Sequence, residues 1–173
     1  MSIALDSMSA YARSIVTRLG LEAHPEGGWY TRDWQSPHED DASGRPLASL
    51  IYFLLPEGDA SAWHKVDADE LWLWHGPATV TLEFGGDGEV PAASDACTRV
   101  TLGAGIAENT ASTANISTTA NTASTGDDDN TSAIVAHAIV PAGVWQRTVP
   151  GSGDALVSCV VSPGFVFEGF TLE

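Results

Sequence analysis

Basic residues are scarce in this sequence of 173 residues. Seven Lys and Arg stand against 23 Asp and Glu, so the formal net charge is -16 at pH 7. An electrostatic field of that sign repels phosphate backbones and anionic membrane surfaces. We therefore expect no nucleic-acid partner, and we interpret the acidity mainly as a source of solubility.

Long apolar runs are also missing. The longest apolar run covers residues 47–55, whereas a membrane-spanning helix needs about 20 apolar residues. The first residues include Asp6 and contain no Lys or Arg before Arg13, which is unlike the basic start and apolar centre of a secretory signal. We expect a cytoplasmic protein with no membrane partner.

Cysteine is rare as well. The two cysteines, Cys97 and Cys159, lie far apart and in no metal-ligand spacing, so we interpret them as ordinary thiols of a reducing compartment. No repeat of 20 to 50 residues is visible, which excludes propellers and solenoids. The sequence as a whole is 43% hydrophobic and 17% charged. This composition is typical of one globular domain, which would span residues 1–173.

One long helix is predicted, near the start of the chain. Asp6 and Ser7 are candidates to accept hydrogen bonds from its first turn, and Gly20 can supply a left-handed stop. The apolar residues that recur at helical spacing are Met8, Tyr11, Ile15 and Leu19.

The remainder consists of short apolar runs separated by Gly, Pro, Asp and Ser, which is typical of an antiparallel sandwich or barrel. Residues 104–132 do not follow this pattern, because they are rich in Ala, Ser, Thr and Asn and have almost nothing to bury. We predict a disordered or mobile surface insertion there, with a decorated or sticky segment as the alternative. The predicted strands are 28–34, 47–55, 70–74, 79–84, 99–102, 133–140, 145–149, 155–162 and 165–172.

His64 and Glu70 form the strongest candidate site. They flank a predicted turn at residues 66–69, which would bring an imidazole and a carboxylate into one pocket. In an extended strand Glu70 shares a face with Trp72 and Trp74, and His75 lies on the other face. A carboxylate beside two indoles is partly desolvated, so its pKa should rise. The alternative is a surface histidine and a glutamate at the rim.

The same residues resemble the cupin family. His64, Glu70 and Gly76, followed by Pro141-x-Gly143 and Gln146, look like degenerate forms of the two cupin motifs. More specifically, six segments are similar to a cupin subgroup catalogued as a domain of unknown function, with a His-Pro-Glu-Gly-Gly motif and a jelly roll of the sugar-epimerase type. These segments are residues 24–30, 51–55, 63–66, 69–72, 140–146 and 162–165.

The resemblance implies an all-β double-stranded β-helix, the cupin jelly roll, with one N-terminal α-helix. It also implies a pocket inside the barrel and a homodimer. It implies no settled reaction, because cupins include epimerases, isomerases, oxygenases, lyases and binders without activity.

Departures from the cupin pattern concern the metal ligands. Val66 and Gln146 stand where the pattern has histidines, which leaves His64, Glu70 and Gln146 as the metal set. Metal sites normally need three or more strong donors, so we expect no metal cofactor, with a weak divalent-metal site as the alternative. His137, on the strand leading to Pro141, is a candidate replacement ligand.

Three functions are compatible with these residues, and each involves a small polar ligand or none. The first is a sugar epimerase or isomerase in which His64 is the general base and Glu70 orients it or acts as the acid. In this reading Tyr30 or Tyr52 donates a proton.

The second function is a binding module without activity. Gln146 and Glu70 would orient its ligand, and Glu26 either contributes to the site or only anchors a turn. The third is a structural or storage-like jelly roll with no ligand. The indoles that would stack on a ligand in the binding module are those of Trp63, Trp72, Trp74 and Trp145.

Overall fold

The structure is a computed structural model that describes residues 2–105 and 134–173. The predicted insertion at 104–132 therefore lies outside the described residues beyond Gly105. No helix in the described ranges is long and apolar enough to cross a membrane.

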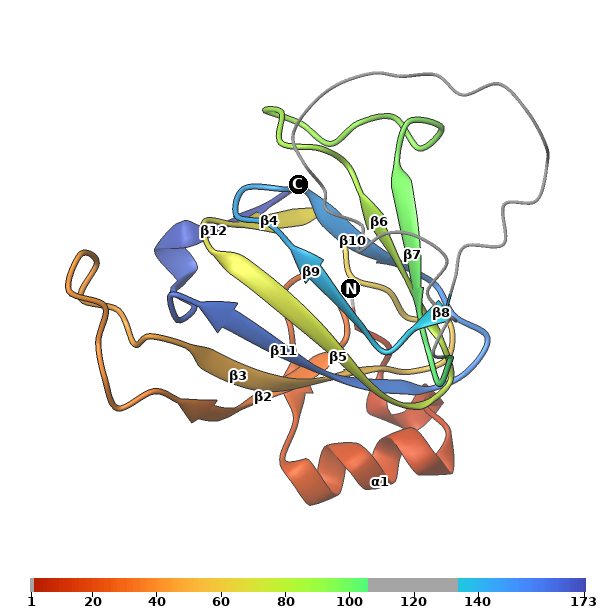
Figure 1. Cartoon of the computed structure of the whole chain (residues 1–173). Coiled ribbons are helices and arrows are strands. Elements are labelled where there is room, and N and C mark those ends of the chain that lie inside the picture. Colours follow the sequence, from red (N-terminus) through yellow and green to blue (C-terminus); the bar gives the residue numbers. More distant parts are fainter. Residues whose placement is uncertain (1, 106–133) are drawn as a thin grey trace.

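Two six-stranded sheets face each other, and the core lies between them (Figure 1). Neighbouring strands are antiparallel except for β7 and β8, which are parallel. This arrangement is the predicted jelly roll. The first sheet consists, in spatial order, of β1 (Glu22–Ala23), β2 (Trp29–Gln35), β3 (Ser49–Leu55), β11 (Ala155–Ser162), β5 (Asp69–Pro77) and β9 (His137–Val140). The second sheet consists of β12 (Phe170–Leu172), β4 (His64–Val66), β10 (Gln146–Val149), β6 (Val80–Phe84), β7 (Thr98–Leu102) and β8 (Ile134–Val135).

The core is built from inward-facing residues of both sheets. Period-two alternation places every second side chain of a strand on the inner face. The largest fully buried side chains of this core are Phe53, Trp72, Leu82, Leu102, Val140 and Val157.

The helix α1 (Ala10–Leu19) packs on the outer face of the first sheet, with Leu54 among its contacts (Figure 1). It ends at Gly20, whose φ of 66° is the predicted left-handed stop. The prediction of its start was wrong, because Oγ of Ser9 accepts the hydrogen bond from the first turn. Asp6 and Ser7 lie instead in the short 3-10 helix η1 (Leu5–Ser7).

The face that α1 buries also differs from the predicted stripe. Met8, Ala12 and Val16 are buried, whereas Tyr11 is 41% exposed. Ala12 and Val16 are four residues apart and lie in one row along the helix. Met8 packs with them from the extended segment before Ser9. The buried face of the helix is therefore shifted by one residue from the predicted stripe, with Ala12 buried in place of Tyr11.

Two predicted strands are interrupted. The strand predicted at 133–140 is described from residue 134 and divides at Ala136 into β8 and β9, which belong to different sheets. The strand predicted at 165–172 contains the 3-10 helix η2 (Phe167–Gly169) before β12. In both segments the chain crosses from one sheet toward the other, which a continuous strand does not allow.

The bend between β4 and β5 positions the site. β4 ends at Val66 in the second sheet and β5 begins at Asp69 in the first. The predicted turn is thus a crossover between sheets and not a hairpin. It nevertheless brings His64 and Glu70 to the same interior space.

Candidate functional site

A cavity of about 450 Å³ opens between the two sheets. Its wall comes from β1 to β5, the turn between β1 and β2, β11, and the segment from residue 165 to residue 170. Aromatic rings form much of the wall, and Arg32 is the only Arg or Lys among the described lining residues. The ionisable side chains in the wall are Glu22, His24, Glu26, Tyr30, Arg32, His64, Glu70, Cys159 and Glu168.

A tight turn directs Glu26 into this cavity. The backbone N–H of Gly27 donates to the carbonyl of His24 at 3.1 Å, and Gly27 has a φ of 111°. A Cβ at Gly27 would collide with the carbonyl oxygen of Ala60, so only glycine fits here. The carbonyl of Glu26 accepts from the N–H of Ala62 at 2.7 Å, which fixes the turn against the segment before β4.

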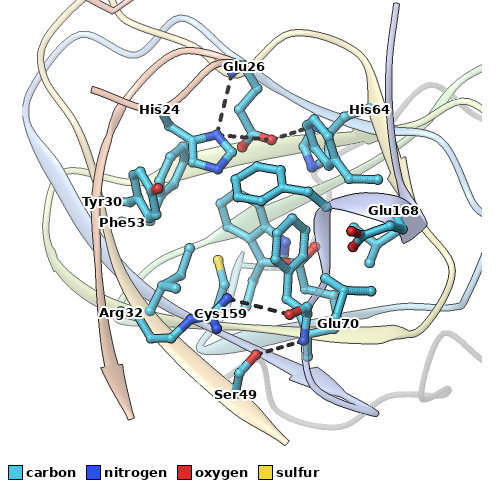
Figure 2. A pocket seen from close by; sticks show the side chains of 18 of the residues that line it. His24, Glu26, Tyr30, Arg32, Ser49, Phe53, His64, Glu70, Cys159 and Glu168 are labelled. Carbon is cyan, nitrogen blue, oxygen red and sulfur yellow. Dashed lines mark hydrogen bonds and ion pairs between the residues drawn. The ribbon is translucent and has the colours of Figure 1, made fainter. Parts of the chain in front are cut away.

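The carboxyl group of Glu26 lies between two imidazoles. Its Oε2 is 3.5 Å from Nδ1 of His24 and 3.3 Å from Nδ1 of His64. All three side chains are buried. Figure 2 shows His24, Glu26 and His64 together at one end of the cavity, with Arg32, Ser49 and Cys159 toward the other end.

Burial favours the uncharged form of each of these groups. It lowers the pKa of His24 to about 4 and, despite a hydrogen bond with the carbonyl of Ala62, the pKa of His64 to about 4. Burial and the nearby carboxyl of Glu70 raise the pKa of Glu26 well above its usual value. At neutral pH the two imidazoles are therefore neutral, and burial favours the protonated form of the Glu26 carboxyl.

Glu70 is the second buried carboxyl of the cavity. Burial raises its pKa to about 7, although hydrogen bonds with Gln146, Cys159 and Trp72 oppose the increase. Burial, with Glu70 and Glu26 nearby, also raises the pKa of the Cys159 thiol well above its usual value. The thiol is therefore protonated and a weak nucleophile at neutral pH.

Gln146 lies behind the cavity wall and joins two wall residues. Its Nε2 donates to Oε2 of Glu70 at 2.5 Å, and its Oε1 accepts from Nε1 of Trp72 at 2.9 Å. Gln146 is 1% exposed and does not line the cavity. The prediction that it contacts a ligand or a metal does not match this geometry, because both ends of its amide already have protein partners.

Besides Glu26, four predicted site residues line the cavity. Tyr30, His64, Glu70 and Trp72 all contribute to the wall. The ring of Tyr30 packs edge-on against His24, with centroids 4.5 Å apart. Trp72 is only 1% exposed, and its N–H is occupied by Gln146, so it offers a ligand little surface.

Trp63 and Tyr52 lie outside the cavity, which corrects two predictions. His64 faces inward, so Trp63, one residue earlier on the chain, faces outward. There the guanidinium of Arg147 lies 4.7 Å from its ring centroid. Tyr52 packs with α1 on the outer face of the first sheet, and its ring contacts His75.

The other two indoles and His137 also lie away from the cavity. Nε1 of Trp74 donates to the carbonyl of Ala78 at 2.7 Å, and Nε1 of Trp145 donates to the carbonyl of Gly88 at 2.9 Å. Neither ring lines the cavity. His137 is exposed on β9, next to the buried Ala138, so it cannot replace a missing ligand at Glu70.

Sequence reasoning missed His24, Arg32 and Cys159 as wall residues. His24 belongs to the same motif as Glu26, and its proximity in sequence was the available signal. Cys159 lies on β11, next to Trp72 of β5 in the sheet, which no pattern in the sequence indicates. Among the residues that the structure describes, no group of three or more His, Cys, Asp or Glu could hold a metal ion.

Comparisons with known proteins agree with this architecture. No curated protein matches. A solved structure of a protein from Shewanella oneidensis is 30% identical, with a TM-score of 0.70, over 94% of this chain and 84% of that one. A hypothetical protein from Leishmania major is 26% identical, with a TM-score of 0.69, over 94% of this chain and 86% of that one. The model of the family described as Cupin superfamily (DUF985) matches residues 13–173, so the chain belongs to this cupin family.

Proposed function

We propose that this protein binds a small polar molecule in its barrel cavity and transfers protons on it, as an isomerase or epimerase of the sugar-epimerase type does. The observation that carries the proposal is the convergence of Glu70 and the group around Glu26 on one cavity of about 450 Å³. A cavity of that size suits a small molecule.

Glu70 supplies a carboxyl group whose pKa lies close to neutral pH. General acid–base catalysis is most effective when the pKa lies near the working pH. Burial raises the pKa of Glu70 to about 7, so both of its protonation states are populated. Glu70 is therefore the group that we assign to proton transfer at its end of the cavity.

His64 needs a different role from that of a lone base. Burial lowers its pKa to about 4, and an isolated imidazole with that pKa is a weak base at neutral pH. Glu26, and not Glu70, lies within 3.3 Å of its Nδ1. Nδ1 of His64 also lies 2.9 Å from the carbonyl oxygen of Ala62. We therefore assign the orientation of His64 to this hydrogen bond, with Glu26 as a neighbour of the ring.

The side chains that line the cavity indicate the class of ligand. The aromatic rings of Phe53, Phe165 and Phe170 lie in the wall with His24 and Glu26, hydrogen-bonding groups whose uncharged forms are favoured by burial. Such a wall suits the apolar faces and hydroxyl groups of a sugar-like ligand. Its interior offers no fixed cation for an anionic group, because Arg32 is exposed.

The test is solvent exchange. The protein is incubated in D₂O with a panel of aldoses and ketoses, and deuterium incorporation next to the carbonyl is followed by NMR. We expect exchange with at least one compound, and a loss on the order of 100-fold in Glu70→Gln. The exposed Glu57→Gln serves as the matched control. Thermal stabilisation by a compound without exchange would instead identify a binding module.

A further inference from the structure

The outer face of the first sheet carries a row of apolar side chains that crosses the sheet from β2 to β9. Residues that pair directly across antiparallel strands share a face of the sheet. One such set of partners, called here the apolar row, contains no polar side chain. In spatial order it consists of Trp34, Leu50, Val160, Leu71 and Ile139.

The apolar row points away from the cavity. Ile51 and Cys159 line the cavity, so their chain neighbours Leu50 and Val160 point outward. The same alternation turns Leu71 outward, because both of its chain neighbours line the cavity. The row therefore lies on the face of the sheet that also carries α1.

No described element buries this row. α1 packs on Leu54 and Leu156, in a neighbouring part of the outer face, and in Figure 1 no described helix lies below the left-hand ends of β2 and β3. None of the five residues belongs to a buried apolar cluster of the described chain. Trp34 is 48% exposed and Ile139 52%. A contiguous apolar surface of this kind marks an interaction site.

The face also lacks the charges that dominate the rest of the protein. The chain has 23 acidic and 7 basic residues, but neither the apolar row nor the row beside it contains one. A basic partner would need carboxylates on this face, whereas a second copy of this acidic chain would be repelled by them. Their absence favours a second copy. The row beside the apolar row consists of Thr31, Tyr52, Ser158, Leu73 and His137.

The apolar row is complementary to itself. Val160 stands at its centre, so a two-fold axis along β11 places the row of one copy in reverse order over the row of the other. Trp34 then faces Ile139 of the partner subunit, and Leu50 faces Leu71 of the partner subunit. The two ends of the row, which are 48% and 52% exposed, thus cover each other.

The area of the face suffices for a dimer. Strands about 4.8 Å apart and outward rows about 6.8 Å apart give about 500 Å² for three rows on five strands. Two copies would bury about 1,000 Å², which is the size that a specific interface needs. The third row includes Ser162 and Asp69, which supply a polar rim.

We propose that the apolar row is the centre of a homodimer interface whose two-fold axis runs along β11. The two first sheets pack face to face, as sheets do in a sandwich. This inference goes beyond the proposed function and does not depend on it, because no residue of the apolar row lines the cavity.

The first test measures the oligomeric state by sedimentation equilibrium. We expect wild type to be a dimer at about 50 μM. Trp34→Lys and Ile139→Glu each bury a charge against an apolar side chain, so each should weaken dimerisation at least about 100-fold. The control is Val90→Glu, at a residue that is 68% exposed and lies between β6 and β7. A monomeric wild type, or unchanged dimerisation in both row variants, would overturn the proposal.

The second test checks the axis by mixing Trp34→Lys with Ile139→Glu. In the mixed dimer the introduced ammonium faces the introduced carboxylate at one end of the row, and the contact at the other end is native. We expect the mixture to dimerise at least about 10-fold more tightly than either variant alone. No gain on mixing would contradict the axis along β11.

The third test uses the wild type and therefore does not depend on whether a charged variant folds. Tryptophan is replaced throughout by 5-fluorotryptophan, and Trp34→Phe assigns the ¹⁹F signal of Trp34. A soluble gadolinium chelate broadens the signals of exposed rings. We expect the Trp34 signal to stay sharp in the dimer, although the ring is 48% exposed in a single copy. A broadened Trp34 signal in a dimeric protein would place the interface elsewhere.

Discussion

At the scale of single residues, the burial of Glu70 gives the protein a distinct dependence on pH. Because the folded-state pKa of about 7 lies above the ordinary value of 4.5, the native state holds a proton that the unfolded state loses. The contribution of Glu70 to stability is therefore present at low pH and is lost as the pH rises through 7. The low pKa values of His24 and His64 act in the opposite direction, with loss as the pH falls from 6.5 to about 4.

Glu70→Gln isolates this contribution. The amide oxygen can still accept from Gln146 but does not ionise. We expect the free energy of unfolding of the variant, relative to wild type, to rise by about 2 kcal/mol between pH 5 and pH 8. Urea unfolding at both pH values measures it, and the histidine contributions cancel in the difference. A constant difference would show that Glu70 titrates at its ordinary pKa.

Gln146→Leu tests the link behind the cavity. The substitution removes the partner of the Trp72 N–H and of Oε2 of Glu70. Because both remaining groups are buried, we expect a loss of about 2–4 kcal/mol in unfolding free energy. The matched control is the exposed Gln35→Leu. Equal, small losses in the two variants would mean that the link contributes little.

At the scale of elements, hydrogen bonds from one arginine hold the C-terminal segment that forms part of the cavity wall. The guanidinium of Arg45 donates to the carbonyls of Gly164 at 2.8 Å and Pro163 at 3.0 Å. It also donates to both carboxylate oxygens of Asp67 at 3.0 Å. The segment after Gly164 contributes Phe165 and its neighbours to the cavity wall. Arg45 thus joins the β4–β5 crossover to this segment.

Arg45→Lys should loosen that wall without unfolding the protein. A lysine ammonium cannot reproduce the planar fork of donors. We expect the backbone amides of residues 165–170 to exchange with solvent at least about 10-fold faster, while those of α1 keep their rate. Hydrogen–deuterium exchange with mass spectrometry resolves the two regions, with the exposed Arg18→Lys as control. Uniform exchange across the chain would contradict a local role.

At the scale of the whole molecule, the charge imbalance opposes compact structure. Seven basic residues can pair with at most seven of the 23 acidic residues, so most carboxylates experience only repulsion. Salt screens this repulsion within a Debye length of about 10 Å at 0.1 M. Repulsion over many exposed groups should outweigh the few surface ion pairs that salt also weakens.

We expect the midpoint of thermal unfolding at pH 7.5 to rise by several degrees between 10 mM and 500 mM NaCl. Sucrose at equal osmolality separates screening from general exclusion effects. A midpoint that falls with NaCl would show that ion pairs, such as those of Glu83 with Arg99 and Arg147, dominate the electrostatics.

The features that the sequence determined are those set by local periodicity. The strand at 155–162 matches its prediction, and Gly20 ends α1 as expected. Alternation along β5 correctly separated Glu70 and Trp72 from His75. These features depend on the geometry of a single strand or turn, which the order of residue types encodes directly.

Only the tertiary structure decided how the site is assembled. Trp63 faces outward because its neighbour His64 occupies the inner position on β4, a strand of three residues too short to show a period. Glu26 reaches two imidazoles because a glycine turn packs beneath Ala60. Alternation tells which residues of one strand share a face, but the identity of the buried face depends on partners distant in the chain, and those partners exist only in the folded molecule.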